Sequence, residues 1–250
     1  MNGSPAAGDG LPLLACRGVH KSFGIRPALI GADLVLRRGE AVALVGLNGA
    51  GKSTLLRIAL DLLAPDAGEV RISGRPAREP GARADVAYLP ERCLPPRHLT
   101  GAELIALLLD QHGVDFDAAA ATRECIALDL DPAVLARRAR DYSKGMAQKL
   151  ALVACLLADR ALLVLDEPMS GLDPSAHRAA RTRLAAARAA GTTLLMSSHA
   201  LHDVAALCER VVVLHAGRIV FDDTFAAFAA RAPGADPEAA FLATIAGSSR

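Results

Sequence analysis

The sequence predicts an α/β fold, in which helices pack on a mostly parallel β-sheet and a helical lobe is inserted in the middle of the chain. Short apolar, strand-like runs alternate with helix-like stretches toward both ends of the chain. A glycine-rich turn joins one of these runs to a helix. The middle of the chain is instead rich in Ala, Leu and Arg in a helical pattern.

The expected elements follow in order along the chain. Strands are predicted for residues 13–19, 32–36 and 41–45, and a helix for residues 52–63. From residue 91 to 157 the pattern is helical, with helices expected at 101–111, 118–128 and 132–140. Strands at 161–165 and 192–197 then alternate with helices at 175–190 and 201–208. A hairpin that turns at Ala216-Gly217 joins 211–214 to 218–221, and a small helical tail is expected from residue 226.

Composition limits the classes of protein to which the chain can belong. Its 250 residues are 52% hydrophobic and 22% charged, which suits one large domain with a buried core. The formal net charge is +1 and no block of like charge occurs, so we expect no nucleic-acid partner. The five cysteines are scattered and form no CxxC pair. This argues against disulfides and a zinc site, and favours small buried side chains in a reducing compartment.

No segment is predicted to span a membrane. Residues 1–10 lack the features of a signal peptide and are expected to be a flexible leader. The apolar run 104–109 is too short to cross a bilayer, and the run 150–165 is interrupted by Asp159 and Arg160. We therefore expect that the chain does not cross a membrane by itself.

The first candidate site is the glycine-rich turn after residues 41–45. Its residues are Gly46, Leu47, Asn48, Gly49, Ala50, Gly51, Lys52 and Ser53, which fit the pattern G-x-x-x-x-G-K-[ST]. The glycines of this pattern let backbone N–H groups approach phosphate oxygens, and the following helix adds positive potential at its N-terminus. Lys52 is expected to reach the outer phosphates of a nucleotide, and Ser53 to ligate Mg²⁺.

A pair of carboxylates, Asp166 and Glu167, follows the apolar run 161–165. A buried parallel strand that ends there brings both to the ligand-binding edge of the sheet. Asp166 suits the second coordination sphere of Mg²⁺, and Glu167 could polarise a water beside the γ-phosphate. A strand that ends in Asp-Glu is often only a turn, but the phosphate loop upstream favours the catalytic interpretation.

A third motif lies between these two. Residues 142–146 read YSKGM and precede a helix, so Ser143 and Gly145 at the helix start predict a second phosphate-binding end. One chain then carries two phosphate sites. Together the motifs, in their order and spacing over about residues 13–221, resemble the nucleotide-binding domain of ABC transporters.

The resemblance implies a P-loop NTPase (RecA-like) core with an antiparallel β portion and an inserted α-helical lobe. It also implies ATP and Mg²⁺ as cofactors, ATP hydrolysis, and dimers that sandwich ATP between the P-loop of one subunit and the signature helix of the other. A single domain is expected over residues 1–250. It divides into an ATPase core at 13–90 and 159–221, a helical lobe at 91–158 and a C-terminal tail at 222–250.

The resemblance assigns roles to further residues. Phe23 matches the aromatic residue that stacks on adenine, the alternative being a plain core residue. Asn48 and Thr54 flank the phosphate loop and its helix. Asp173 matches the loop that connects the two active sites, and His199 matches the histidine that contacts the γ-phosphate and the attacking water.

Two positions depart from the family pattern. Glu91 stands where the family usually has a glutamine that senses the metal and the partner subunit. It is a candidate for Mg²⁺ binding and catalysis, or it merely begins the helical lobe on the surface. The signature reads YSKGM instead of LSGGQ, so Lys144 is either a solvated side chain or an extra cation near the opposite γ-phosphate. Both variants and the tail resemble the bacterial ABC-2 type exporter branch.

The resemblance further implies an integral membrane permease subunit as partner and a peripheral location on the cytoplasmic, inner face of the cell membrane. Export is favoured over import, whereas the transported substrate, the identity of the permease and the choice between homodimer and heterodimer stay open. Soluble ABC ATPases that act on ribosomes, DNA or iron–sulfur assembly are disfavoured, because the sequence predicts one domain and contains no heptad run and no CxxC. A catalytically inactive subunit is disfavoured because Lys52, Asp166, Glu167 and His199 are all present.

Overall fold

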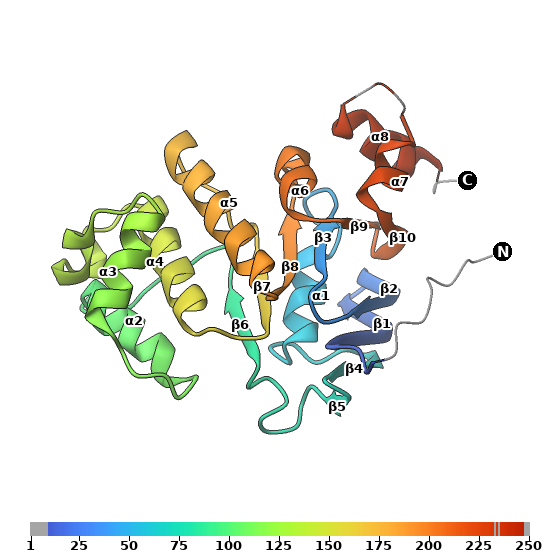
Figure 1. The fold of residues 1–250 in the computed structure, drawn as a ribbon. Helices are drawn as coiled ribbons and strands as arrows, with labels where there is room; N and C mark the ends of the chain where they lie inside the picture. The colour runs from blue at the N-terminus through green and yellow to red at the C-terminus, as the bar shows by residue number, and fades with distance from the viewer. Residues whose placement is uncertain (1–9, 233, 235, 248–250) are drawn as a thin grey trace.

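The protein is described by a computed structural model that covers residues 10–232, 234 and 236–247 (Figure 1). Its centre is a six-stranded sheet in the order β10-β9-β3-β8-β7-β6. The strands are β3 (Ala41–Val45), β6 (Val86–Leu89), β7 (Leu162–Asp166), β8 (Thr193–Ser198), β9 (Arg210–His215) and β10 (Arg218–Thr224). All neighbours pair in parallel except β10 with β9. The predicted α/β class with a mostly parallel sheet is therefore confirmed, whereas residues 1–9 of the predicted leader lie outside the described residues.

A second sheet is antiparallel and has four strands in the order β2-β1-β4-β5. They are β1 (Leu14–Phe23), β2 (Arg26–Leu36), β4 (Ala67–Ile72) and β5 (Arg75–Pro76). The strands β4, β5 and β6 were not among those predicted. The sequence of β4, AGEVRI, is mostly polar or small and only its last residue is buried, so no apolar run marks it.

Helices lie on both faces of the central sheet. After β3, β7 and β8 come α1 (Lys52–Ala59), α5 (Pro174–Ala189) and α6 (Leu201–Leu207). A lobe at one side of the molecule, green to yellow in Figure 1, contains α2 (Gly101–Asp110), α3 (Ala118–Ala127) and α4 (Lys144–Leu157). The tail contains α7 (Phe225–Ala229) and α8 (Pro237–Gly247), which confirms the predicted helical tail in its described part. Within the described residues no helix has both the length and the apolar character needed to span a bilayer.

The central sheet separates two apolar layers because side chains alternate along each strand. In β3, Val42 and Leu44 pack in the layer that contains α1 and the antiparallel sheet. Ala43 and Val45 pack in the opposite layer, with the helices of the lobe. All four residues are at most 2% exposed. The continuous apolar run at 41–45 is thus a strand buried on both faces, which fixes the position of the turn that follows it.

One predicted helix is wrong. Residues 132–140 form two short 3-10 helices, Pro132–Ala136 and Ala139–Asp141, with an extended Arg137 between them. The Arg137 carbonyl accepts hydrogen bonds from the Tyr142 hydroxyl at 2.8 Å and from the Gly101 N–H at 3.1 Å. Both donors lie outside residues 132–140. The Arg137 carbonyl oxygen is therefore paired without the hydrogen bond that a continuous α-helix would supply.

Candidate functional site

The candidate site lies where the parallel strands end. Because the strands run in one direction, the carboxyl ends of β3, β6, β7 and β8 meet at one edge of the sheet. Gly46 follows β3, Glu167 follows β7 and His199 follows β8. Glu91 comes two residues after β6. Segments far apart in the sequence therefore supply a single site.

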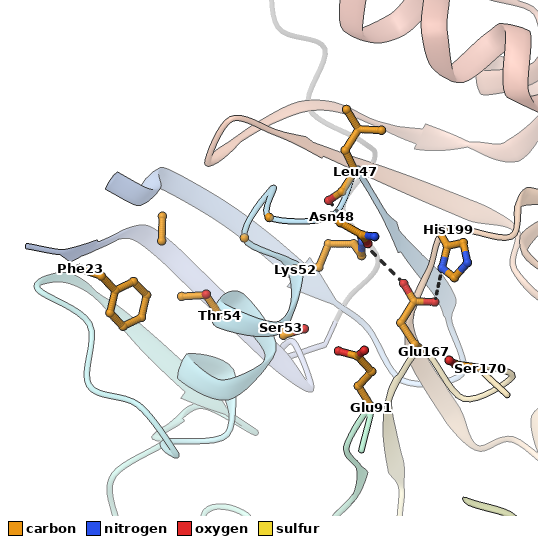
Figure 2. Close-up of a pocket in the computed structure, with 13 residues that line it drawn as sticks. Phe23, Leu47, Asn48, Lys52, Ser53, Thr54, Glu91, Glu167, Ser170 and His199 are labelled. Atoms are coloured by element: carbon orange, nitrogen blue, oxygen red, sulfur yellow. Dashed lines mark hydrogen bonds and ion pairs between the residues drawn. The ribbon is translucent and has the colours of Figure 1, made fainter. Parts of the chain in front are cut away.

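A cavity of about 580 Å³ opens at this edge (Figure 2). It is lined by Phe23, Ala28, Leu47, Asn48, Gly49, Gly51, Lys52, Ser53, Thr54, Glu91, Glu167, Ser170 and His199. All of these were predicted as site residues from the sequence except Ala28 and Ser170, and Ser170 begins the loop 170–173 that the resemblance assigns to the connection between two active sites. The cavity has the size of a typical small-molecule site.

Two glycines shape the turn between β3 and α1. A Cβ at Gly46 would lie 2.4 Å from the Leu214 carbonyl oxygen, and a Cβ at Gly51 would lie 2.5 Å from that of Ala28. Gly51 also has a φ of 111°, which disfavours any residue with a side chain. Gly51 is the N-cap residue of α1, and no side-chain hydrogen bond caps the first N–H groups of this helix. Such a helix start can bind an anion through its backbone.

Lys52 places a cation at the centre of the cavity. Its Nζ donates a hydrogen bond to the Gly46 carbonyl oxygen at 2.7 Å and lies 3.6 Å from Glu167 Oε1. The residue is only 6% exposed. A buried ammonium group needs anionic or carbonyl partners, and these contacts supply them while directing it along the phosphate loop.

Glu167 faces two side chains at once. Its Oε2 lies 2.8 Å from His199 Nδ1, and its Oε1 faces Lys52. Glu167 has a φ of 50°, a left-handed conformation that costs about 1–3 kcal/mol for a residue with a side chain. His199 keeps 66% of its side chain exposed, so its ring is accessible to a ligand in the cavity.

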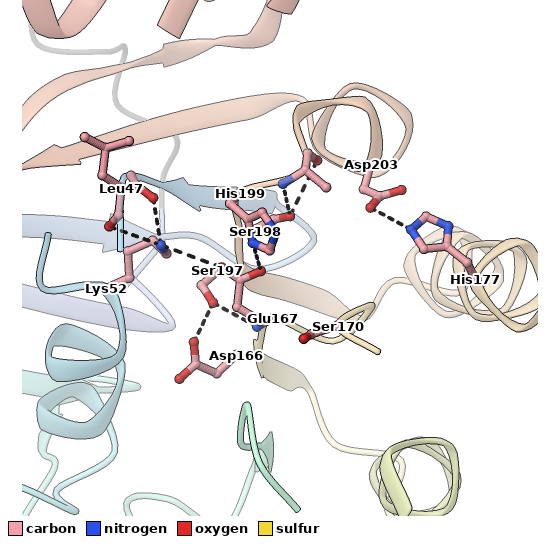
Figure 3. A network of polar contacts seen from close by, with 12 residues as sticks. Leu47, Lys52, Asp166, Glu167, Ser170, His177, Ser197, Ser198, His199 and Asp203 are labelled. Carbon is pink, nitrogen blue, oxygen red and sulfur yellow. Dashed lines mark hydrogen bonds and ion pairs between the residues drawn. The ribbon is translucent and has the colours of Figure 1, made fainter. Parts of the chain in front are cut away.

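Ser197, which sequence reasoning missed, holds both acidic residues (Figure 3). Its hydroxyl donates to Asp166 Oδ1 at 2.5 Å and accepts from the Glu167 N–H at 2.9 Å. Asp166 is 1% exposed, and its Oδ2 has no hydrogen-bond partner in the described part of the chain. A buried carboxylate oxygen without a partner fits a water-bound cation such as Mg²⁺.

Glu91 is exposed and lines the cavity after the end of β6, the strand that pairs with β7. Figure 2 shows its carboxylate pointing into the space between Ser53 and Glu167. Tyr88 lies on β6, three residues before Glu91, and is half-buried. Burial, as the main cause, and the negative charge of Asp166 raise the pKa of its phenol. The Tyr88 side chain therefore stays neutral beside the carboxylates at physiological pH.

Phe23 lies at the far end of the cavity from His199 (Figure 2). It is 55% exposed, so it is not a core residue. The Lys21 ammonium is 5.9 Å from the centre of its ring. An exposed ring at the rim of a cavity can stack on a planar ligand.

Six predicted site residues do not line this cavity: Gly46, Ala50, Asp166, Ser143, Gly145 and Asp173. The last three lie at the starts of two helices. Ser143 caps α4, with its hydroxyl accepting from the Met146 N–H at 3.1 Å. Gly145 lies in the first turn of the same helix. Asp173 caps α5, and hydrogen bonds from the Ala176 N–H, the Ser175 hydroxyl and the Ser175 N–H lower the pKa of its carboxyl to about 2. The phosphate loop and the signature motif of one chain therefore do not share a cavity.

Comparison with known proteins identifies the family. The sequence profile described as ABC transporter matches residues 29–170. An uncharacterized ABC transporter ATP-binding protein of Nostoc sp. is 35% identical over 199 residues, which is 77% of this chain and 58% of that protein. The daunorubicin resistance ATP-binding protein DrrA3 of Streptomyces coeruleorubidus is 34% identical over 83% of this chain and 66% of its own length. The chain thus spans less than two thirds of the length of these two relatives. The Nod factor export ATP-binding protein I of Rhizobium sp. is 34% identical over 80% of this chain and 67% of its own length.

Solved structures agree with this assignment. One described as an ATP-binding subunit of an ABC transporter superposes with a TM-score of 0.83 at 30% identity, over 93% of this chain and 99% of that chain. The ATP-binding cassette MJ0796, in a dimeric post-hydrolysis structure bound to ADP and Pi, has the same fold, with a TM-score of 0.76 at 21% identity over 84% and 98% of the two chains. The predicted resemblance is confirmed: the profile covers more than half of the sequence, and the chain belongs to the ABC transporter family as one of its ATP-binding proteins.

Proposed function

We propose that the chain binds ATP with Mg²⁺ in the cavity at the phosphate loop and hydrolyses its γ-phosphate. The observation that carries this proposal is the position of Glu167, whose two carboxylate oxygens face Lys52 and His199 inside that cavity. A cation for the phosphates, a carboxylate for water and an accessible imidazole then lie together. This is the set of groups that phosphoryl transfer to water requires.

In this proposal the nucleotide lies along the cavity, with its adenine on Phe23 and its phosphates on the loop 46–54. Backbone N–H groups of the loop and the start of α1 would contact the β- and γ-phosphates, and Lys52 would neutralise them. Ser53, Asp166 and Glu91 would hold Mg²⁺, directly or through water. Mg²⁺, when bound, supplies positive charge that stabilises the transferring phosphoryl group. Among the described residues no cluster of three acidic, His or Cys side chains could hold a metal alone, which suits a cation that shares its ligands with phosphates and water.

Hydrolysis would begin with a water between Glu167 and the γ-phosphate. As the water oxygen bonds to phosphorus, Glu167 accepts its proton, and the bond to the β–γ bridging oxygen breaks to release ADP and phosphate. His199 would leave its contact with Glu167 in part to contact the γ-phosphate. Lys52 stabilises the negative charge on the oxygens in both the ground state and the transition state.

The signature motif is proposed to act on the nucleotide of a second subunit. Ser143 and Gly145, at the start of α4, are not among the residues that line the cavity of their own chain, so we expect them not to contact the nucleotide bound there. Two chains, identical or homologous, that meet with ATP between them would bring each α4 start to the other chain's phosphates. Asp173, in the loop before α5, would lie near the contact between the two sites. The dimeric structure of the ATP-binding cassette MJ0796 supports this arrangement.

We further propose that the dimer powers export through a separate integral membrane permease, from the inner face of the cell membrane. The name of one relative, Nod factor export ATP-binding protein I, supports export over import. Residues 13–90 and 159–221 would form the ATPase core, 91–158 the helical lobe that contains the signature motif, and 222–250 the tail. Purified chain is the direct test: it should release phosphate from ATP only with Mg²⁺, and membranes from the source cell should yield a permease that co-purifies with it. A chain that binds ATP but never releases phosphate, alone or with the permease, would contradict the proposal.

A further inference from the structure

Lys144, the residue that makes the signature motif atypical, contacts the cavity loop of its own chain. Its Nζ donates a hydrogen bond to Ser170 Oγ at 3.3 Å. Ser170 lines the nucleotide cavity and lies on the loop that follows Glu167 (Figure 2). The first turn of α4 is thereby joined to the loop after β7, across 26 residues of sequence.

The same loop is tied to Glu167 through the backbone. The Ser170 N–H donates to the Glu167 carbonyl oxygen at 3.0 Å. Glu167 and Gly171 have φ angles of 50° and 78°, so both ends of this turn are left-handed. A turn with two left-handed positions has few alternative conformations. Two consecutive hydrogen bonds therefore lead from the Lys144 ammonium to the backbone of Glu167.

Packing reinforces this connection. A Cβ at Gly171 would lie 3.3–3.4 Å from Cδ, Cε and Nζ of Lys144, so the lysine stem lies directly against the loop backbone. A Cβ at Gly145 would lie 3.1 Å from the Gly171 carbonyl oxygen. The start of α4 and the loop are thus in close contact at two points. A side chain added at either glycine would meet the opposing element, so the two elements approach closely here.

We propose that Lys144 is a positioning residue for hydrolysis: it holds Ser170, and through Ser170 the backbone of Glu167, in place relative to the phosphate loop. The start of α4 and the catalytic carboxylate then move as one unit. The inference rests on the proposed function, since it needs Glu167 to act on water. It differs from both roles suggested by the sequence, because the exposed Lys144 side chain hydrogen-bonds to Ser170 of its own chain.

Steady-state hydrolysis by the purified chain tests the role of the hydrogen bond. Lys144→Met keeps most of the apolar stem of the side chain and removes its charge, and Ser170→Ala removes the acceptor. Each should lower kcat about three- to tenfold, because a partly exposed hydrogen bond to a charged group is weak. KM for ATP should change less than about twofold, because the hydrogen bond positions Glu167 and does not contact the nucleotide. The double variant should lose no more than either single variant. Lys144→Arg should keep the parental kcat.

The matched control is Arg123→Met, which removes another exposed cation from the lobe, on α3. Its kcat should equal that of the parental chain. Equal losses in Arg123→Met and Lys144→Met would trace the effect to the charge of the lobe and overturn the inference. Additive losses in the double variant would overturn it as well, because independent residues add.

Hydrogen–deuterium exchange supplies a readout that needs no turnover. The peptide covering residues 162–172 should exchange faster in Lys144→Met and Ser170→Ala than in the parental chain, and Arg123→Met should not change it. A parental chain that hydrolyses ATP beside a Lys144→Met variant with unchanged kcat and exchange would refute this inference and leave the proposed function intact. Absence of hydrolysis in the parental chain would refute the proposed function, and the exchange rates would then decide alone whether Lys144 holds the loop.

Discussion

Glu167 Oε2 lies 2.8 Å from His199 Nδ1, although the two residues follow different strands, β7 and β8. The register of the parallel sheet produces this contact, since Asp166 pairs with Ser197 just before both residues. The second oxygen of Glu167 faces Lys52 at 3.6 Å. With 11% of its side chain exposed, the carboxylate is oriented by two partners and shielded from bulk water. This arrangement connects the fold to hydrolysis.

Substitutions of Glu91 distinguish a role in Mg²⁺ binding from a role on the surface. If its carboxylate contacts Mg²⁺, Glu91→Ala should weaken the Mg²⁺ dependence of hydrolysis and slow it about tenfold, which corresponds to about 1.4 kcal/mol of barrier. Glu91→Gln should have a milder effect, because an amide oxygen keeps the contact without the charge. Titration of Mg²⁺ against the rate measures both, with the neighbouring exposed Arg92→Ala as control. An unchanged rate and Mg²⁺ dependence in Glu91→Ala would make Glu91 a coupling or surface residue only.

ATP-dependent dimerisation follows from the separation of the two phosphate-binding motifs. Glu167→Gln, loaded with ATP, should elute as a dimer in size-exclusion chromatography because the nucleotide persists between the subunits. Adding Ser143→Arg should restore the monomer, since the larger side chain fills the start of α4. Ala119→Arg on α3 adds the same charge to an exposed position and should leave the dimer intact. Dimerisation that survives Ser143→Arg unchanged would remove the sandwich arrangement.

Asp173 should make part of the stability depend on pH. Hydrogen bonds at the start of α5 lower the pKa of its carboxyl from 3.8 to about 2. The folded pKa lies below the unfolded value, so the stabilisation is complete above about pH 4 and is lost as pH falls toward about 2. Asp173→Ala should therefore unfold at lower urea than the parental chain at pH 7, and the difference should shrink at pH 3. Asp173→Asn keeps a capping oxygen and should lose little at pH 7. A difference as large at pH 3 as at pH 7 would exclude the charge as its source.

The sequence was most informative where the determinants are local. The phosphate loop needs glycine at Gly46 and Gly51 because neighbouring carbonyls leave no space for a Cβ, and both glycines stand in the motif itself. The strand 41–45 was predicted with its observed bounds because it is buried on both faces and so forms a continuous apolar run. Local chemistry and local structure coincide in this part of the chain.

The sequence did not predict features that depend on contacts between residues far apart in the chain. Ser197 positions Asp166 and Glu167 only because β8 pairs with β7, and a serine near a strand end carries no signal of that pairing. The segment 132–140 has a helical composition, but Tyr142 and other residues bind its carbonyl groups and favour 3-10 turns. The contact of Lys144 with Ser170 likewise depends on how α4 packs against the loop after β7.

The most direct test of the account compares Glu167→Gln with Lys52→Ala. A general base acts on the attacking water, whereas a cation on the phosphates acts already in the bound state. Glu167→Gln should keep its affinity for ATP and lose about 10² to 10⁴ in the rate of phosphate release, and Lys52→Ala should lose nucleotide binding. Binding of a fluorescent ATP analogue and phosphate release are measured on the same preparations. Hydrolysis by Glu167→Gln at the parental rate would contradict the assignment of Glu167 as the base and, with it, the mechanism built on this cavity.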